Sequence, residues 1–140
     1  MMSQSFNPPS VWTPFGAFSM GVVQGEGQVV YLKGQVALNA EGEIVGTGDM
    51  TLQVRTVLNN IQLVLAHVGG EMSDIISLTQ YVTDIEAFMA AGLVRSEFFQ
   101  APFPVTTTVE VSRLYHPDLM VEITAIAEIP KDRFVQPEPT

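Results

Sequence analysis

The stretch V105-TTTVEVSRLYHPDLMVEITAIAE-I129 contains two runs in which apolar and polar residues alternate. The runs are Val105–Leu114 and Met120–Ile129, and the turn-forming sequence Tyr115–Asp118 separates them. A period of two in β-branched residues is typical of strands. The short connection predicts that these two strands pair antiparallel.

Glu122 is the residue of greatest chemical interest in this stretch. Alternation places it on one face with Thr124 and Ile126, and Val121 and Ile123 flank it in the chain. A carboxylate among apolar neighbours that packs against another surface must be paired, protonated or used in chemistry. Two roles stay open here: a catalytic carboxylate, or a carboxylate of a subunit interface that backbone N–H groups hold.

Composition limits the classes of protein to consider. The chain has 140 residues, 46% of them hydrophobic, which is typical of one folded domain. It contains no cysteine, so disulfides and a thiolate nucleophile are excluded. No apolar run has the length of a membrane span, and the N-terminus lacks the pattern of a signal peptide. A cytoplasmic protein without a membrane partner is expected.

Charge argues against nucleic acid as a partner. The formal net charge is −9, with six Lys and Arg against fifteen Asp and Glu. Nucleic-acid binding needs clustered cations, whereas these are scattered along the sequence. His67 and His116 show no metal-ligand spacing, so neither a metal site nor a bound cofactor is expected.

The remaining pattern predicts an α+β sandwich of order β-β-β-α-β-α-β-β, with two helices on one face of a mixed sheet. One domain is expected, with an extended lead-in over residues 1–13, anchored to the body by Trp12 and Phe15, and a tail over residues 131–140. The expected elements are strands Phe18–Val23, Gln28–Val36, Glu43–Val45 and Asp74–Thr83, a hairpin turn Gln24–Gly27, and helices Met50–Val68 and Glu86–Phe99.

Two segments resemble the C-terminal signature of the RidA/YjgF family. They are Thr108–Leu114, TVEVSRL, and Val121–Ala127, VEITAIA, and the similarity runs from about Pro14 to Ile129. Members of this family are reactive-intermediate deaminases that hydrolyse enamines and imines. The resemblance implies a chorismate-mutase-like sandwich, a homotrimer with clefts between neighbouring subunits, and a small-molecule substrate.

The chain departs from the family at the residue that binds the substrate carboxylate. In the family this is the arginine of a Pro-Ala-Arg-Ser/Thr motif; the sequence here is Pro104-Val105-Thr106-Thr107. A guanidinium binds a carboxylate through two charge-assisted hydrogen bonds. Its replacement by Thr106 is expected to remove roughly 2–5 kcal/mol of binding to a carboxylate substrate.

Further positions complete the predicted site. Glu122 is the predicted catalytic residue, which would hold and deprotonate the attacking water or, alternatively, pair with an amine or amide of the substrate. The family resemblance assigns substrate binding to Phe18, where the family has tyrosine, Lys33 (serine), Gly34 (retained), Gly92 (asparagine), Thr106 and Thr108 (cysteine). Lys33 has three readings: it supplies the lost positive charge, it pairs with Glu122, or it is a plain surface lysine.

Two functions follow as hypotheses. The first is a hydrolytic deaminase that acts on a small imine, enamine or related C–N substrate, with a specificity changed by Thr106. The second is a non-catalytic trimer that binds a small metabolite or a partner protein in the same inter-subunit clefts.

Overall fold

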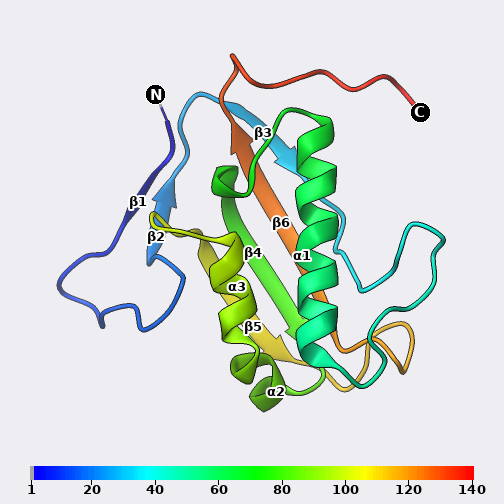
Figure 1. The fold of residues 1–140 in the computed structure, drawn as a ribbon. Coiled ribbons are helices and arrows are strands. Elements are labelled where there is room, and N and C mark those ends of the chain that lie inside the picture. Colours follow the sequence, from blue (N-terminus) through cyan, green and yellow to red (C-terminus); the bar gives the residue numbers. More distant parts are fainter. Residues whose placement is uncertain (1) are drawn as a thin grey trace.

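Over residues 2–140, which the computed structural model describes, a four-stranded sheet is covered on one face by helices (Figure 1). The expected α+β class is therefore confirmed. The helices are α1 (Met50–His67), α2 (Ile85–Ala90), α3 (Gly92–Phe98) and the short 3-10 helix η1 (Met72–Asp74). The strands are β1 (Gln4–Phe6), β2 (Gly21–Val23), β3 (Gln28–Tyr31), β4 (Ile75–Val82), β5 (Val105–Glu110) and β6 (Val121–Ile129).

The strands of the main sheet lie in the order β3-β6-β4-β5. β6 is antiparallel to both β3 and β4, and β5 lies parallel to β4. The predicted antiparallel pairing of the last two strands is therefore wrong, because β4 lies between them. The segment 111–120 that joins them crosses the end of β4; neighbouring strands lie only about 4.8 Å apart, so a connection of this length crosses one easily.

The core lies between β6 and α1. The apolar stripe of α1 and the alternate positions of β6 are inaccessible to solvent: Val54, Val57, Leu58, Ile61 and Leu65 on the helix, and Val121, Ile123, Ala125 and Ala127 on the strand. The Asp49 side chain accepts a hydrogen bond of 3.0 Å from the N–H of Leu52 and caps the helix. The long helix is thus confirmed, with its end at His67.

The N-terminal region differs from the prediction. The lead-in contains β1, which pairs antiparallel with β2, so residues 24–27 do not form a hairpin between β2 and β3. Instead the N–H groups of Gly25 and Gly27 each donate a 2.8 Å hydrogen bond to the carboxylate of Glu128 on β6. An acceptor from a distant strand therefore shapes this glycine-rich turn, which local sequence cannot reveal.

Two other elements also differ. The predicted strand Glu43–Val45 is reduced to an isolated bridge between Leu38 and Ile44. The predicted second helix begins after the N-cap Asp84 as expected, but it is interrupted at Ala91 and continues as α3. This interruption sets the direction in which α3 presents its side chains.

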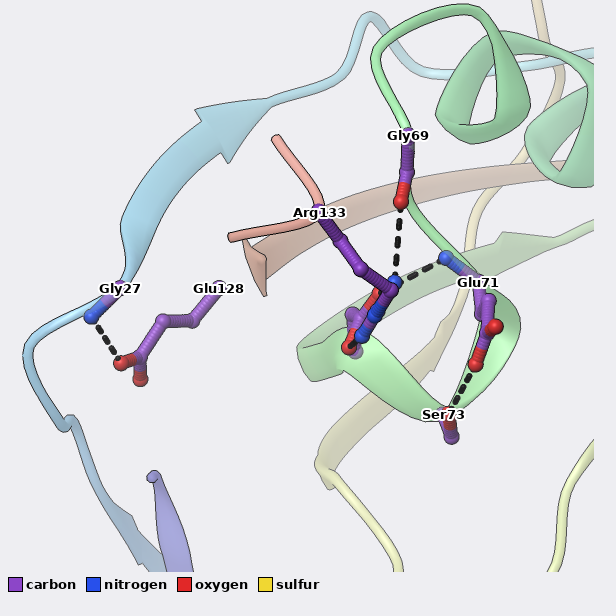
Figure 2. A network of polar contacts seen from close by, with 7 residues as sticks. Gly27, Gly69, Glu71, Ser73, Glu128 and Arg133 are labelled. Carbon is purple, nitrogen blue, oxygen red and sulfur yellow. Dashed lines mark hydrogen bonds and ion pairs between the residues drawn. The ribbon is translucent and has the colours of Figure 1, made fainter. Parts of the chain in front are cut away.

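The C-terminal segment is fixed to the body as far as Val135. Arg133 forms a two-pronged ion pair with the buried Asp74, with N–O distances of 2.9 Å and 2.6 Å, and donates to the carbonyl of Gly69 at 2.9 Å. Figure 2 shows Arg133 directed at Gly69 and the η1 turn, with Gly27 facing Glu128 nearby. The hydrogen bond to Asp74 raises the pKa of Arg133. The predicted tail is thus held through its first residues.

Candidate functional site

The sheet register divides the predicted site residues between two faces. Thr106 lies opposite Leu78, and Thr108 opposite Gln80, on the face that the helices cover. Glu122 lies opposite Tyr81, on the face without helices, which we call the open face. Within one chain, therefore, the predicted catalytic carboxylate and the two threonines are separated by the sheet itself.

On the helix side, a cleft of about 640 Å³ lies between β5, α3 and the segment 12–20. Four of the predicted residues line it: Phe18, Gly92, Thr106 and Thr108. Leu78, Gln80 and Phe99 are buried and form its floor, whereas Trp12, Phe15 and Met89 are exposed and form its rim. The structure thus brings together residues from three separate parts of the sequence.

Aromatic rings dominate the rim. Trp12 stacks on Phe15 with ring centroids 5.6 Å apart, and Phe15 meets the edge of Phe18 at 5.2 Å. Phe15 is 78% exposed and Trp12 is 60% exposed. The expectation that these two residues anchor the N-terminal segment to the body is therefore wrong. They pack on each other and on Phe18, and they offer their remaining surface to the cleft.

Gln80 is a polar residue of the cleft floor that the sequence analysis missed. It is 2% exposed, and its Nε2 donates to the Thr108 hydroxyl at 2.8 Å, while its Oε1 has no hydrogen-bond partner in the described chain. Turning the amide over would leave the nitrogen unpaired instead. A buried polar atom without a partner is costly, and such atoms are concentrated at functional sites. The signal was available: Gln80 interrupts the apolar alternation of Leu78 and Val82.

Arg95 is the second residue that the sequence analysis missed. It lines the cleft from α3, with its Cζ 4.3 Å from the centroid of the Phe88 ring. Burial lowers the pKa of this guanidinium, and no carboxylate within residues 2–140 pairs with it. The sequence pattern does not predict that Arg95 lines the cleft, because the direction of its side chain depends on the interruption of the helix at Ala91.

The other predicted residues meet on the open face. Gly34 lies directly against Glu122, because a Cβ built on Gly34 would collide with the Glu122 carboxylate and lie 3.0 Å from the Thr124 hydroxyl. The exposed Lys33 donates from Nζ to the carbonyl of Gly34 at 3.4 Å. No ion pair joins Lys33 to Glu122 in the part of the chain that the structure describes.

Glu122 and Glu128 share the open face of β6 but differ in their surroundings. Glu128 is 6% exposed and is held by two backbone N–H groups, as described above. The half-buried Glu122 carboxylate has no hydrogen bond from any residue between positions 2 and 140. Within one chain, backbone N–H groups thus hold Glu128 and not Glu122, and both roles of Glu122, catalytic or at a subunit interface, stay predictions.

Two classes of site are not found in the described residues. No group of three or more His, Cys, Asp or Glu there is placed to hold a metal ion. No helix within residues 2–140 has the length and apolar character needed to cross a membrane.

The fold and the cleft define a class of protein: a small α+β sandwich with helices on one face of its sheet and a cleft between these helices and strands β4 and β5. Residues 10–129 match the family described as Endoribonuclease L-PSP. The chain belongs to this family, which is also known as RidA/YjgF, and the resemblance seen in the sequence is confirmed.

Relatives and solved structures agree with this assignment. The chain is 35% identical over 115 residues to a RutC family protein of Pyrococcus abyssi, covering 81% of this chain and 87% of that protein. It is 33% identical over 116 residues to a 2-iminobutanoate/2-iminopropanoate deaminase of Dermatophagoides farinae, covering 83% and 88%. The crystal structure of the Rid family protein YyfB from Yersinia pestis superposes with a TM-score of 0.83 at 30% identity, covering 92% of this chain and all of that one (100%).

Proposed function

We propose that this protein is a hydrolytic deaminase that converts a small imine, or the enamine in equilibrium with it, to a carbonyl compound and ammonia. The observation that carries the proposal is the Glu122 carboxylate, which has no partner within residues 2–140 and lies in the space that the missing side chain of Gly34 leaves for it. The similarity to a protein named as an imine deaminase supports it.

The proposed active site needs a second copy of the chain. The helix-side cleft and Glu122 lie on opposite faces of the sheet, so a neighbouring subunit must bring its open face to this cleft. The open face is suited to burial, because Tyr31, Tyr81 and Val109 all project from it into solvent. Exposed apolar surface of this kind indicates an interface. A homotrimer with one cleft at each interface is the assembly we propose.

The chemistry requires one acid–base group and a water molecule. Glu122 takes a proton from the water as its oxygen bonds to the imine carbon, and the C=N π electrons move to nitrogen, which takes up a proton. The resulting carbinolamine expels ammonia and leaves the carbonyl group, so that one imine and one water yield one carbonyl compound and one ammonia. A carboxylate with free lone pairs suits this role, whereas Glu128 already uses its oxygens on backbone donors.

Ribonuclease activity, which the family description also names, is less well supported. The net charge is −9, and the cleft residues include a single cation, Arg95, among those that the structure describes. A polynucleotide carries one phosphate per nucleotide, so a protein that binds it needs several cations along the binding groove.

The test is ammonia release from imines generated in situ by an amino-acid oxidase, from alanine and from phenylalanine. Glu122→Gln is expected to lower the rate at least about a hundredfold. Glu86→Gln is the matched control, because Glu86 is exposed on α2 and does not line the cleft. Equal rates for wild type and Glu122→Gln would overturn the proposal.

A binding function without turnover is the second candidate, and Phe18 favours it, since phenylalanine supplies no hydroxyl to the cleft. Under this alternative, no imine in the panel would release ammonia faster than in buffer, while a small ligand would still raise the melting temperature.

A further inference from the structure

We propose that Arg95 is the group in this cleft that binds a carboxylate of the ligand, and that the aromatic rim selects acids with an aromatic or large apolar side chain. The anion anchor is thus carried by helix α3 and not by strand β5. The proposal deepens the proposed function, because it concerns the same cleft and names the substrate class.

The first argument is the position of the guanidinium. Arg95 and Thr106 line the same cleft from opposite walls, one on α3 and the other on β5. A Cβ built on Gly92 would lie 3.6 Å from Nη2 of Arg95, so this guanidinium occupies the space that a side chain at position 92 would point toward. The absence of a side chain at Gly92 and the presence of the cation are therefore parts of one local arrangement.

The second argument is the state of the guanidinium. The Phe88 ring packs against the Arg95 guanidinium and orients it. None of the N–H groups of this guanidinium has a hydrogen-bond acceptor within residues 2–140. A cation over an aromatic face is favourable but leaves its in-plane donors free. Planar guanidinium donors match the two oxygens of a carboxylate. Arg95 thus has the orientation and the free donors of an anion anchor.

The third argument is the unsatisfied amide on the floor. Gln80 pairs with Thr108 through one of its polar atoms only, and the other is buried in the cleft floor without a partner. A ligand that carries both an anionic group and a hydrogen-bonding nitrogen or oxygen would satisfy Arg95 and, once the buried amide turns toward the cleft, Gln80 as well. An imino acid has this combination of groups.

The charge of the cleft lining and the aromatic residues of its rim limit the classes of ligand that fit. Among the described residues that line the cleft within one chain, Arg95 is the single charged one, so this half of the site offers one positive charge to a ligand. The overall charge of −9 further disfavours a dianion such as a phosphate ester. Trp12, Phe15 and Phe18 form a continuous aromatic surface at the entrance, which suits a ring or a large apolar side chain.

The experiment measures binding of two stable probes to the full-length protein by calorimetry: 3-phenylpropionate and its neutral isostere 3-phenylpropanamide. Wild type is expected to bind the acid at least about tenfold more tightly than the amide. Arg95→Met is expected to abolish this preference, and Arg95→Lys to retain part of it. Arg55→Met is the matched control, because it removes an exposed arginine that is paired with Glu97 and does not line the cleft. Lys33→Met tests a competing cation on the open face.

The outcomes separate this proposal from the proposed function. If Arg95→Met keeps the full preference for the acid, or if Lys33→Met abolishes it, Arg95 is not the anchor, whatever the rate of ammonia release. If wild type does not distinguish the two probes, the proposal is also overturned. If the preference follows Arg95 but no imine is hydrolysed, the anchor stands and the deaminase activity fails. Arg95→Met/Thr106→Arg adds a rescue: recovery of the preference would show that the loss in Arg95→Met is one of charge and not of folding.

Discussion

Thr106 and Glu122 lie two strands apart in one sheet, and their side chains leave that sheet through opposite faces. No side-chain rearrangement within one chain brings them to a common substrate. The sheet that carries them is at the same time a wall of the cleft and, through its other face, the surface proposed to complete the cleft of a neighbour. Under the proposed function, this relationship makes the assembly a requirement of the reaction.

Complementation between two inactive variants tests that relationship. Thr106→Trp fills the helix-side cleft, and Glu122→Gln removes the carboxylate from the open face; each homo-oligomer is expected to be inactive. In an equimolar mixture that is unfolded and refolded together, about a quarter of the clefts combine two intact halves, so about a quarter of the wild-type rate is expected. A mixture as inactive as its components, at the oligomer size of wild type, would place the whole site within one chain.

Glu122 and Glu128 are expected to differ in how much stability the same substitution costs. Glu128→Gln turns one acceptor into a donor that faces the backbone N–H groups of Gly25 and Gly27, so urea unfolding is expected to show a loss of about 2 kcal/mol. Glu122→Gln loses no hydrogen bond and is expected to change the free energy of unfolding by less than about 0.5 kcal/mol. A large loss of stability in Glu122→Gln would argue for a structural role of that carboxylate.

Gly34→Ala tests the close approach of the backbone to Glu122. The added Cβ collides with the carboxylate, so Glu122 must shift, and the rate of ammonia release is expected to fall about tenfold or more. Gly42→Ala is the control: its Cβ meets no atom within 4 Å, but its φ of +79° strains an alanine. It is expected to cost about 1 kcal/mol of stability and to leave the rate unchanged. An unchanged rate in Gly34→Ala would remove Gly34 from the site.

Two arginines test how burial governs the strength of an ion pair. Arg133→Met leaves Asp74, whose side chain is 6% exposed, without its partner and is expected to cost about 2 kcal/mol in urea unfolding. Arg55→Met breaks an exposed pair, with 40% and 54% of the two side chains accessible, and is expected to cost less than about 1 kcal/mol. Similar losses for the two variants would contradict this account.

The raised pKa of Arg133 predicts how the stability contribution of the Arg133–Asp74 ion pair depends on pH. Because Asp74 raises this pKa, the contribution of the guanidinium at neutral and alkaline pH is complete below the pKa of an unfolded arginine, and it is lost only as the pH rises through the folded pKa. The stability difference between wild type and Arg133→Met is therefore expected to stay constant from about pH 7 to about pH 10. A difference that declines across this range would assign the effect to another group.

Local pattern predicted the faces of the strands but not their neighbours. The alternation around Glu122 and Thr106 assigned each residue to the correct side of its strand, because the period of two is a property of the backbone. The order of strands depends on where the segment 111–120 crosses, and the glycine turn before β3 depends on Glu128, about a hundred positions away in the chain. Arg95 was missed for a related reason: the kink at Ala91 decides its direction.

The segment that forms the rim of the cleft, residues 7–20, can be replaced as one unit. Residues 7–20, which carry Trp12, Phe15 and Phe18, leave and re-enter the body where Phe6 pairs with Gly21. Two main-chain hydrogen bonds hold the end of the segment. The N–H of Met20 donates to the Asn7 side chain at 2.8 Å, and the N–H of Ser19 donates to the Pro104 carbonyl at 2.9 Å. Lengthening such a closed loop costs little, about 0.6 kcal/mol for each doubling. Grafting a different sequence between these fixed ends would therefore redesign which side chains the cleft admits, while the core and the anchor on α3 stay as they are.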